Sequence, residues 1–234
     1  MRSLQRVGSC LAVLVVVAGC ASTTVTEQHY YAGTAELARP DHIYVYPFAA
    51  TPVDIPTWAA AAGRQAQPRT REELAAGRQL GALVAADLVS EIQGMGLPGA
   101  VAGLQTPLKV NDLLFVGYFE SIEKGSASDR VTLGFGTGAA ELRTAVEAYQ
   151  MTKDGPRQLG SGRGTASGGR TPGLIVPAVV MVATANPIGL MAGGAAKAQG
   201  EIAGKDTLEG MAKNTARTIA ERLRLRFQEQ GWIR

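Results

Sequence analysis

The sequence predicts an α/β domain of the α+β type, in which one mixed or antiparallel sheet of four to five strands is covered by two long helices. Residues 69–95 and 206–228 have the apolar period of amphipathic helices, and residues 113–164 consist of apolar or alternating runs separated by turn residues. The order strand, helix, strands, helix favours one sheet with both helices on the same face. An apolar, glycine-rich helical insertion is expected before the second helix.

The composition fits one folded domain of moderate size. The chain has 234 residues, of which 46% are hydrophobic and 18% charged, and this balance excludes a mostly disordered protein. Two cysteines and two histidines leave little material for a disulfide framework, a cysteine-rich metal site or a Cys/His catalytic pair. We therefore expect no catalytic residue, no metal and no cofactor.

The first residues have the pattern of a bacterial lipoprotein signal. Arg2 and Arg6 precede an apolar run at residues 11–17 that is too short for a membrane span, and the sequence VAGC then ends at Cys20. Small residues before a cysteine resemble the lipobox, where the thiol receives a diacylglyceryl group and cleavage leaves the cysteine first. We expect residues 1–19 to be removed and Cys20 to anchor the protein to a membrane. The alternative is an ordinary signal peptide with an incidental cysteine.

The signal also changes the charge and the cysteine count. Removal of Arg2 and Arg6 from the 23 basic side chains leaves 21 against 20 acidic ones, a net charge of about +1, so no nucleic-acid partner is expected. Cys10 is lost and Cys20 is modified, which leaves no disulfide. An aspartate directly after the lipidated cysteine would resemble the inner-membrane retention signal of enterobacteria, but this chain has Ala21 there. By that analogy we expect the outer membrane, with the domain facing the periplasm.

The mature chain begins with polar residues 20–40, which we expect to be a tether ahead of a single domain at residues 41–234. Residues 43–48 predict the first strand, and Pro47 suggests its end. Residues 51–68 predict a loop with a short helical turn at 58–62. The first helix follows, with a capping box at Thr70–Glu73.

The middle of the chain predicts the rest of the sheet. Residues 100–104 are a short apolar piece, and residues 113–119 are an apolar run typical of a central strand buried on both faces. Residues 130–135 and 141–150 alternate, the second with Leu142 on one face and Glu147 on the other, as in a half-exposed strand. Asp154 and Gly155 predict a hairpin turn, after which residues 158–164 return antiparallel.

Two glycine-rich segments could be mistaken for catalytic motifs. Gly136-Thr137-Gly138 lacks the spacing of a phosphate-binding loop, and a turn or bulge is the simpler interpretation. The tract 160–169 resembles a flexible linker and falls short of a nucleophile elbow. His29 lies in the tether and His42 opens the first strand, so both are expected at solvated or edge positions.

Residues 171–196 carry no charge and include two short apolar pieces around an Asn-Pro turn. Three interpretations are open: a buried helical insertion, a surface that contacts a membrane or another subunit, and a true span. The candidate contact residues are Val176, Val179, Val180, Ile188, Leu190 and Met191. Arginines at 222, 224, 226 and 234 complement the dipole of the last helix, and contact with anionic lipid headgroups is the alternative.

The lipobox, Asp112-Leu113-Leu114, the run 130–136, Asn186-Pro187 and the closing Gly231-Trp232-Ile233 together resemble the domain of unknown function 4410 family of bacterial lipoproteins. That family has no assigned reaction, so the resemblance implies no catalytic residues. The order of elements is also distantly similar to the periplasmic domain of the curli-secretion lipoprotein, whose pore is formed by strand hairpins. The apolar insertion here lacks their alternation.

These observations predict a non-enzymatic, membrane-anchored lipoprotein whose periplasmic domain is an interaction or assembly module. A protein partner or self-association in the envelope is expected. The alternatives are a ring-forming secretion component of the outer membrane and a small-ligand-binding or enzymatic domain that uses the loop Gly136-Thr137-Gly138.

Overall fold

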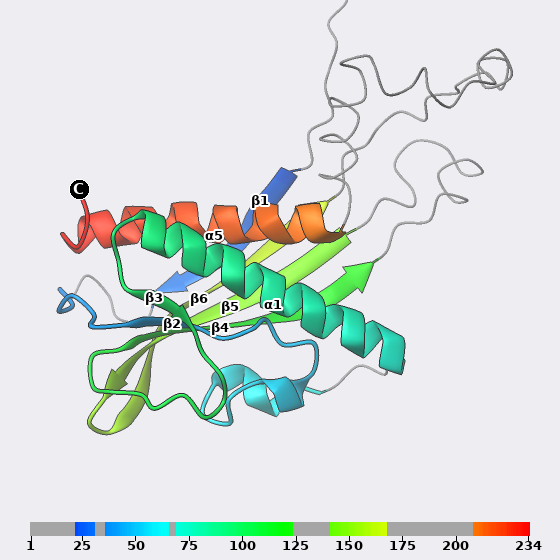
Figure 1. Cartoon of the computed structure of the whole chain (residues 1–234), viewed down its shortest axis with the longest axis horizontal. Coiled ribbons are helices and arrows are strands. Elements are labelled where there is room, and N and C mark those ends of the chain that lie inside the picture. Colours follow the sequence, from blue (N-terminus) through cyan, green and yellow to red (C-terminus); the bar gives the residue numbers. More distant parts are fainter. Residues whose placement is uncertain (1–21, 31–35, 66–68, 124–140, 168–207) are drawn as a thin grey trace, which may run out of the picture.

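The computed structural model describes residues 22–30, 36–65, 69–123, 141–167 and 208–234. In this part of the chain, six strands form one mixed sheet in the order β1-β6-β5-β4-β2-β3, and two long helices lie on one face of it (Figure 1). The elements are β1 (Ser22–Tyr30), β2 (Ile43–Val45), η1 (Pro52–Asp54), η2 (Ala60–Gly63), α1 (Arg71–Gly94), β3 (Gly99–Val101), β4 (Leu113–Glu123), β5 (Glu141–Thr152), β6 (Gly155–Ser167) and α5 (Leu208–Glu229). The predicted fold class is confirmed.

Strand β1 is an addition to the predicted sheet, and it corrects the prediction of a tether for residues 22–30. It pairs antiparallel with β6, from Ser22 opposite Ser167 to Tyr30 opposite Gly160, with a register shift between Val25 and Glu27. The segment has many β-branched residues but no apolar alternation. It forms a strand because its backbone hydrogen-bonds to the edge of β6, which would otherwise be free.

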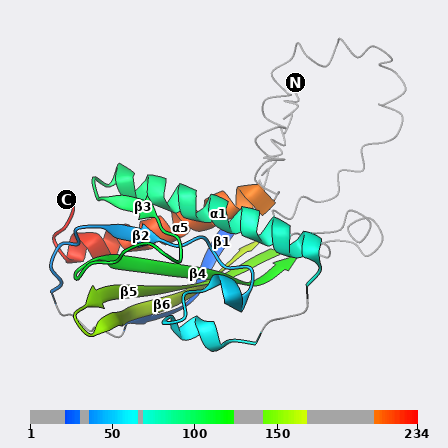
Figure 2. The ribbon, with the colours of Figure 1, turned by 60° about the horizontal axis from the view of Figure 1, so that its bottom comes forward.

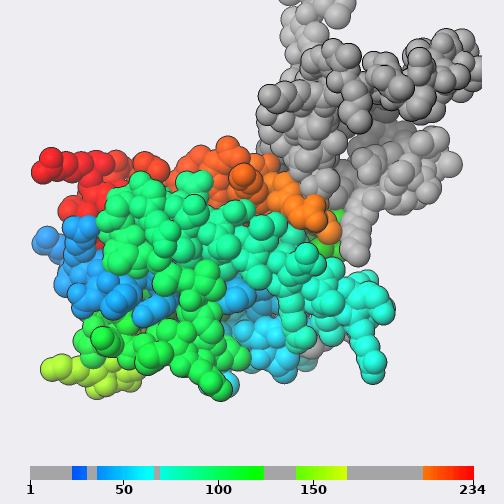
Figure 3. Space-filling view, in the orientation of Figure 1, coloured from blue at the N-terminus to red at the C-terminus, as the bar shows by residue number. Residues whose placement is uncertain are grey.

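Helix α1 follows the prediction closely. The Thr70 hydroxyl accepts a hydrogen bond of 3.2 Å from the Glu73 amide, and the Glu73 carboxylate accepts one of 2.8 Å from the Thr70 amide. This is the predicted capping box. Helix α5 is likewise found where it was expected, and the two helices lie side by side over the sheet (Figure 3).

The sheet has a core on each face. Between the helices and the sheet lie β4 residues such as Phe115, together with Leu88 and Met211. On the opposite face, the chain that contains η1 and η2 crosses the sheet and packs Ile55 and Ala59 against Leu114 (Figure 2). Strand β4 is therefore buried on both faces, as predicted.

The second core corrects the prediction that one face of residues 141–150 is exposed. Leu142 faces the helices as expected, but Glu147 on the other face is only 7% exposed. The loop segment that carries η2 covers this end of β5. The sequence of β5 alone could not indicate that a distant loop returns to it.

The β5–β6 hairpin is confirmed, with Gly155 at φ 111° in its turn. Strand β6 extends through Ser167, so the part of the tract 160–169 up to that residue is not a linker. The glycines adopt a strand because they pair with β5 on one side and with β1 on the other.

Three segments outside the described residues leave from one end of the sheet. Ser22 is opposite Ser167, and Glu123 is opposite Glu141. Helix α5 begins near the same end (Figure 1). Within the described residues, neither helix is long and apolar enough to cross a bilayer.

Candidate functional site

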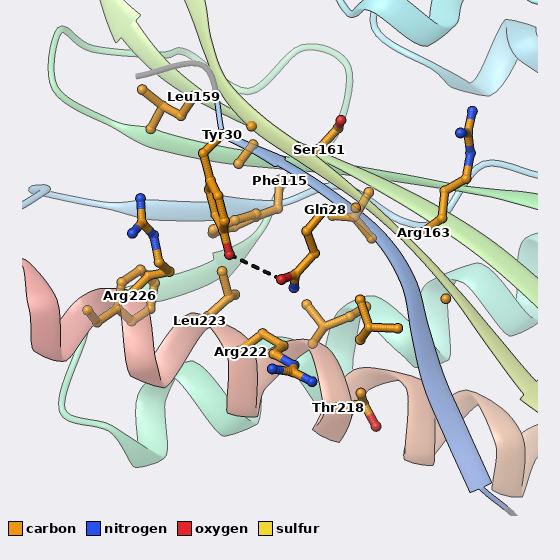
Figure 4. Close-up of a pocket in the computed structure, with 18 of the residues that line it drawn as sticks. Gln28, Tyr30, Phe115, Leu159, Ser161, Arg163, Thr218, Arg222, Leu223 and Arg226 are labelled. Atoms are coloured by element: carbon orange, nitrogen blue, oxygen red, sulfur yellow. Dashed lines mark hydrogen bonds between the residues drawn. The ribbon is translucent and has the colours of Figure 1, made fainter. Parts of the chain in front are cut away.

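A cavity lies between α5 and the part of the sheet formed by β1, β6 and β5, and its volume is about 180 Å³. Figure 4 shows Gln28 and Tyr30 reaching from β1 toward α5, with Arg222, Leu223 and Arg226 on the helix. Most of the lining is apolar, with polar groups at a few positions. A mostly apolar lining with a few polar groups is typical of sites that bind small molecules.

The cavity exists because β6 offers no side chains to the helix at three alternate positions. Gly160, Gly162 and Gly164 are directly opposite residues 148, 146 and 144 of β5, which face the helices. Directly opposed residues share a face of the sheet. The floor beneath α5 is therefore bare backbone at these three positions of β6, and no β6 side chain reaches the helix from them.

Helix α5 presents two rows of side chains to the cavity. Thr215, Ile219 and Leu223 repeat every four residues, and Thr218, Arg222 and Arg226 form a second row with the same spacing. Residues four apart lie one above the other on a helix. The first row is mostly apolar and the second is polar, so the helix gives the cavity an apolar interior and a charged border.

One end of the cavity contains hydroxyl groups without partners. The Thr215 hydroxyl is buried, with 2% of the residue exposed, and neither it nor the Thr23 hydroxyl forms a hydrogen bond with any described residue. Thr144 lies at the same end, where its hydroxyl donates a 3.4 Å hydrogen bond to the Gly164 carbonyl. Buried polar groups without a partner are uncommon and call for an explanation.

The other end of the cavity is closed by aromatic contacts. The Arg226 guanidinium lies over the Tyr30 ring, 4.2 Å from its centroid, and also pairs with Glu229. The Tyr30 hydroxyl donates a 3.3 Å hydrogen bond to the Gln28 side chain, as the dashed line in Figure 4 indicates. The rings of Phe227 and Trp232 lie beyond, 5.3 Å apart.

A second, polar cluster lies on the opposite face of the sheet. The Arg163 side chain pairs with Glu27 of β1 and, at 2.9 Å, with Glu120 of β4. The Arg64 guanidinium donates a 2.6 Å hydrogen bond to the Tyr118 hydroxyl and also pairs with Glu120. Hydrogen bonds to the two carboxylates raise the pKa of Arg163, which stays charged. The cluster therefore links β1, β4 and β6 across the sheet.

Beside this cluster, Glu147 and Tyr149 are buried and bonded to each other. The Tyr149 hydroxyl donates to the Glu147 carboxylate at 2.7 Å and accepts from the Ala60 amide at 2.8 Å. The Ala61 amide donates to the same carboxylate at 3.3 Å. Burial raises the pKa of Tyr149 far above its usual range, and Glu147 adds to the increase. The polar groups of Glu147 and Tyr149 therefore bond to each other and to the backbone at η2, and so hold η2 on the sheet.

Both histidines are at the positions expected for them, at an edge or partly in solvent. His29 lies on β1, where its Nε2 atom is 2.8 Å from Glu27. His42 precedes β2, and its Nδ1 atom is 3.1 Å from the carboxylate of Asp112, which is fully buried. The Asp112 carboxylate also accepts from the Lys109 amide at 2.7 Å and so holds the turn before β4. Among the described residues, no group of three His, Cys, Asp or Glu side chains could hold a metal.

The predicted site residues lie outside the described residues. These are the lipidation residue Cys20, the loop Gly136-Thr137-Gly138 and the contact residues Val176, Val179, Val180, Ile188, Leu190 and Met191. The cavity, by contrast, was missed. Its only signal in the sequence is the alternation of Gly160, Gly162 and Gly164. This alternation indicates a bare face only if the segment is already known to be a strand.

Residues 43–185 match the model of a protein family, described as a domain of unknown function, DUF4410. The chain belongs to the DUF4410 family. The match includes β2 to β6 and α1, whereas β1 and α5, which form two sides of the cavity, lie outside it. The resemblance noted in the sequence is therefore confirmed.

Comparison with characterised proteins adds little to the family assignment. No curated protein matches the chain. Among solved structures, a PelC dodecamer from Paraburkholderia phytofirmans has 15% identity and a TM-score of 0.35, and a variant of the same dodecamer has 18% identity and a TM-score of 0.37. Each comparison covers 65% of this chain and 86% of the other. This DUF4410 domain is thus distantly similar to PelC.

Proposed function

We propose that this DUF4410 protein is a lipid-anchored protein of the bacterial outer membrane, attached through Cys20 and facing the periplasm. Its domain acts as a non-enzymatic interaction or assembly module. Residues 171–196, with Val176, Val179, Val180, Ile188, Leu190 and Met191, are the candidate contact with the membrane or with another envelope protein.

The observation that supports this proposal is the position of Ser22 opposite Ser167 at one end of the sheet. Cys20 precedes Ser22 by two residues, which span at most about 7 Å of extended chain. The uncharged stretch begins at Thr171, four residues after Ser167. The described residues nearest in sequence to the anchor and to the uncharged stretch are therefore paired in the sheet, and an anchored domain would hold this end toward the bilayer.

The anchor is tested by membrane fractionation of full-length variants in a bacterial host. We expect the unmodified protein to stay with the membranes after a high-salt wash and to incorporate labelled palmitate. Cys20→Ala should lose both properties. Cys10→Ala is the matched control, because Cys10 lies in the segment that cleavage removes. Retention of Cys20→Ala on salt-washed membranes would overturn the anchor.

The contact is tested by deletion of residues 171–196 from the otherwise intact chain. We expect the deletion to remove crosslinked complexes from detergent extracts and to leave membrane attachment unchanged. Unchanged complexes after crosslinking and size separation would contradict the contact assignment, while leaving the anchor untouched.

A second candidate is a ring-forming secretion component. Residues 124–140 also leave from the end of the sheet at which Ser22 lies, because Glu123 is opposite Glu141. Two chain segments that leave beside an anchor would suit an assembly that faces the membrane. Electron microscopy of the purified lipidated protein distinguishes the candidates, since only this one requires regular rings.

A further inference from the structure

We propose that the cavity beneath α5 binds a fatty acid, with part of the acyl chain over the glycine floor of β6 and the carboxylate at the threonine-rich end beside Arg222. Nothing in the proposed anchoring requires this site. The inference depends on the shape of the cavity, on its apolar walls and on the polar groups at one end.

The floor of the cavity suits a single unbranched chain. Gly160 and Gly164 are four residues apart in a strand, so the bare strip is about 13 Å long. Tyr30 and Gln28 of β1 lie along one side of it, and α5 lies above.

The walls of the cavity are made of apolar side chains from every surrounding element. Phe115 comes from β4, Val146 from β5, Leu159 from β6, and Ile219 and Leu223 from α5. Contact with such side chains removes methylene groups from water, which contributes about 0.8 kcal/mol for each buried methylene. An acyl chain is the ligand that uses this kind of wall over its whole length.

The headgroup is indicated by Arg222. This arginine lines the cavity and forms no ion pair with any described residue, whereas Arg226 is already paired with Glu229. Long side chains on a helix lean toward its N-terminus, which brings the Arg222 guanidinium over the turn that contains Thr218. One free guanidinium matches one carboxylate, because the two groups form a bidentate pair.

The unpartnered Thr215 hydroxyl gives an independent indication of a ligand at this end. It is buried and lines the cavity together with the Thr23 hydroxyl, which also has no partner among the described residues. A carboxylate between Arg222 and these hydroxyls would accept their hydrogen bonds. The cavity has hydroxyl donors that could bond to an oxygen ligand, in a place that is otherwise apolar.

The test uses full-length protein reconstituted in vesicles of phosphatidylethanolamine and phosphatidylglycerol. The probe is palmitic acid with a photoreactive diazirine on its acyl chain, and the methyl ester of the same probe is the neutral comparison. We expect the acid to label peptides from residues 158–164 and 208–223, and the ester to label them much less. Equal labelling by acid and ester would mean that the cavity takes an uncharged chain, such as one attached to Cys20, and would overturn the carboxylate assignment.

Two variants locate the ligand. Gly162→Leu places a side chain on the floor, where a Cβ atom meets only ordinary contacts of 3.5 and 3.9 Å, and we expect labelling to fall to background. Gly103→Leu is its control, because Gly103 has open space around it. Arg222→Gln should reduce labelling by the acid roughly fivefold. Arg217→Gln is its control, because Arg217 bonds to Asn214 and does not line the cavity.

Thermal unfolding shows whether each variant is folded. If Gly162→Leu is unfolded, labelling of Arg222→Gln still tests the site. Arg222 is exposed, so its substitution leaves the core intact. Labelling by the acid that neither Gly162→Leu nor Arg222→Gln reduces would overturn the proposed site.

Discussion

The Tyr149 hydroxyl donates a 2.7 Å hydrogen bond to the Glu147 carboxylate two residues earlier on β5. Side chains two apart in a strand share a face, and here both are buried beneath η2. The amides of Ala60 and Ala61 bond to the same two side chains. This pair therefore holds a loop on the sheet by polar groups inside an apolar core. Because Tyr149 is titratable, the stability of the protein should depend on pH through this contact.

Tyr149→Phe is expected to flatten the loss of stability at alkaline pH. The pKa of Tyr149 is raised in the folded state, so its contribution is complete below about pH 10 and decreases as the pH rises further, by at most about 1.4 kcal/mol per pH unit. At pH 7 the variant should be less stable by about 1–2 kcal/mol, since it loses the hydrogen bonds. Urea unfolding between pH 7 and 11 measures both effects, with Tyr44→Phe as the control. Stability curves that stay parallel above pH 10 would contradict the expectation.

Gly81→Ala is expected to be severely destabilising. A Cβ atom at Gly81 would lie 1.9 Å from the carbonyl oxygen of Phe48, which is backbone and cannot turn away. Helix α1 would have to move off the sheet, and we expect a loss of about 3 kcal/mol or more. Gly94→Ala, at the end of the same helix with nothing near it, should gain up to about 1 kcal/mol. Thermal unfolding compares the two, and equal melting temperatures would show that the close approach is absent.

Arg163→Gln is expected to loosen β1 without unfolding the domain. Arg163 pairs with Glu27 on β1 and Glu120 on β4, and these pairs hold the edge strand from the face opposite the helices. Hydrogen exchange of the amides in residues 22–30 should become roughly threefold faster. Arg143→Gln serves for comparison, since Arg143 pairs with Glu141 on its own strand. If both substitutions increased amide exchange in β1 equally, the ion pairs of Arg163 with Glu27 and Glu120 would not be what holds β1 on the sheet.

Thr70→Ala tests the capping box of α1. The substitution removes the acceptor for the Glu73 amide, and we expect the free energy of unfolding to fall by about 1 kcal/mol. Glu72→Ala changes the neighbouring acidic residue and should have a smaller effect, because that side chain takes no part in the box. Chemical denaturation measures both, and a loss for Glu72→Ala as large as for Thr70→Ala would assign the effect to charge instead.

Elements with a strong apolar period could be predicted from the sequence. The helices α1 and α5 are of this kind, because their patterns record which face meets a core. The buried β4 is a continuous apolar run, and the β5–β6 hairpin is indicated by its Asp-Gly turn. Strand β1 could not be predicted, since most of its side chains are polar and its pairing with β6 is a long-range event. The burial of Glu147 depends on η2, almost ninety residues earlier in the chain.

The candidate site was less accessible to prediction than the fold. Glycines at 160, 162 and 164 indicate a flexible linker when they are considered locally, and they become the floor of a cavity only when both neighbouring strands and α5 are in place. Cys20, the loop at 136–138 and the contact residues in 171–196 stay predictions.

The attachment of β1 beside Cys20 has a mechanical consequence. If Cys20 is anchored, a load between the bilayer and a partner held at the far end of the domain acts along β1. The eight residue pairs that join β1 to β6 would then be pulled in shear and would have to slip together. They would not open one after another like a zipper. The edge strand would thus serve as a stiff mechanical coupling between the membrane and the folded body.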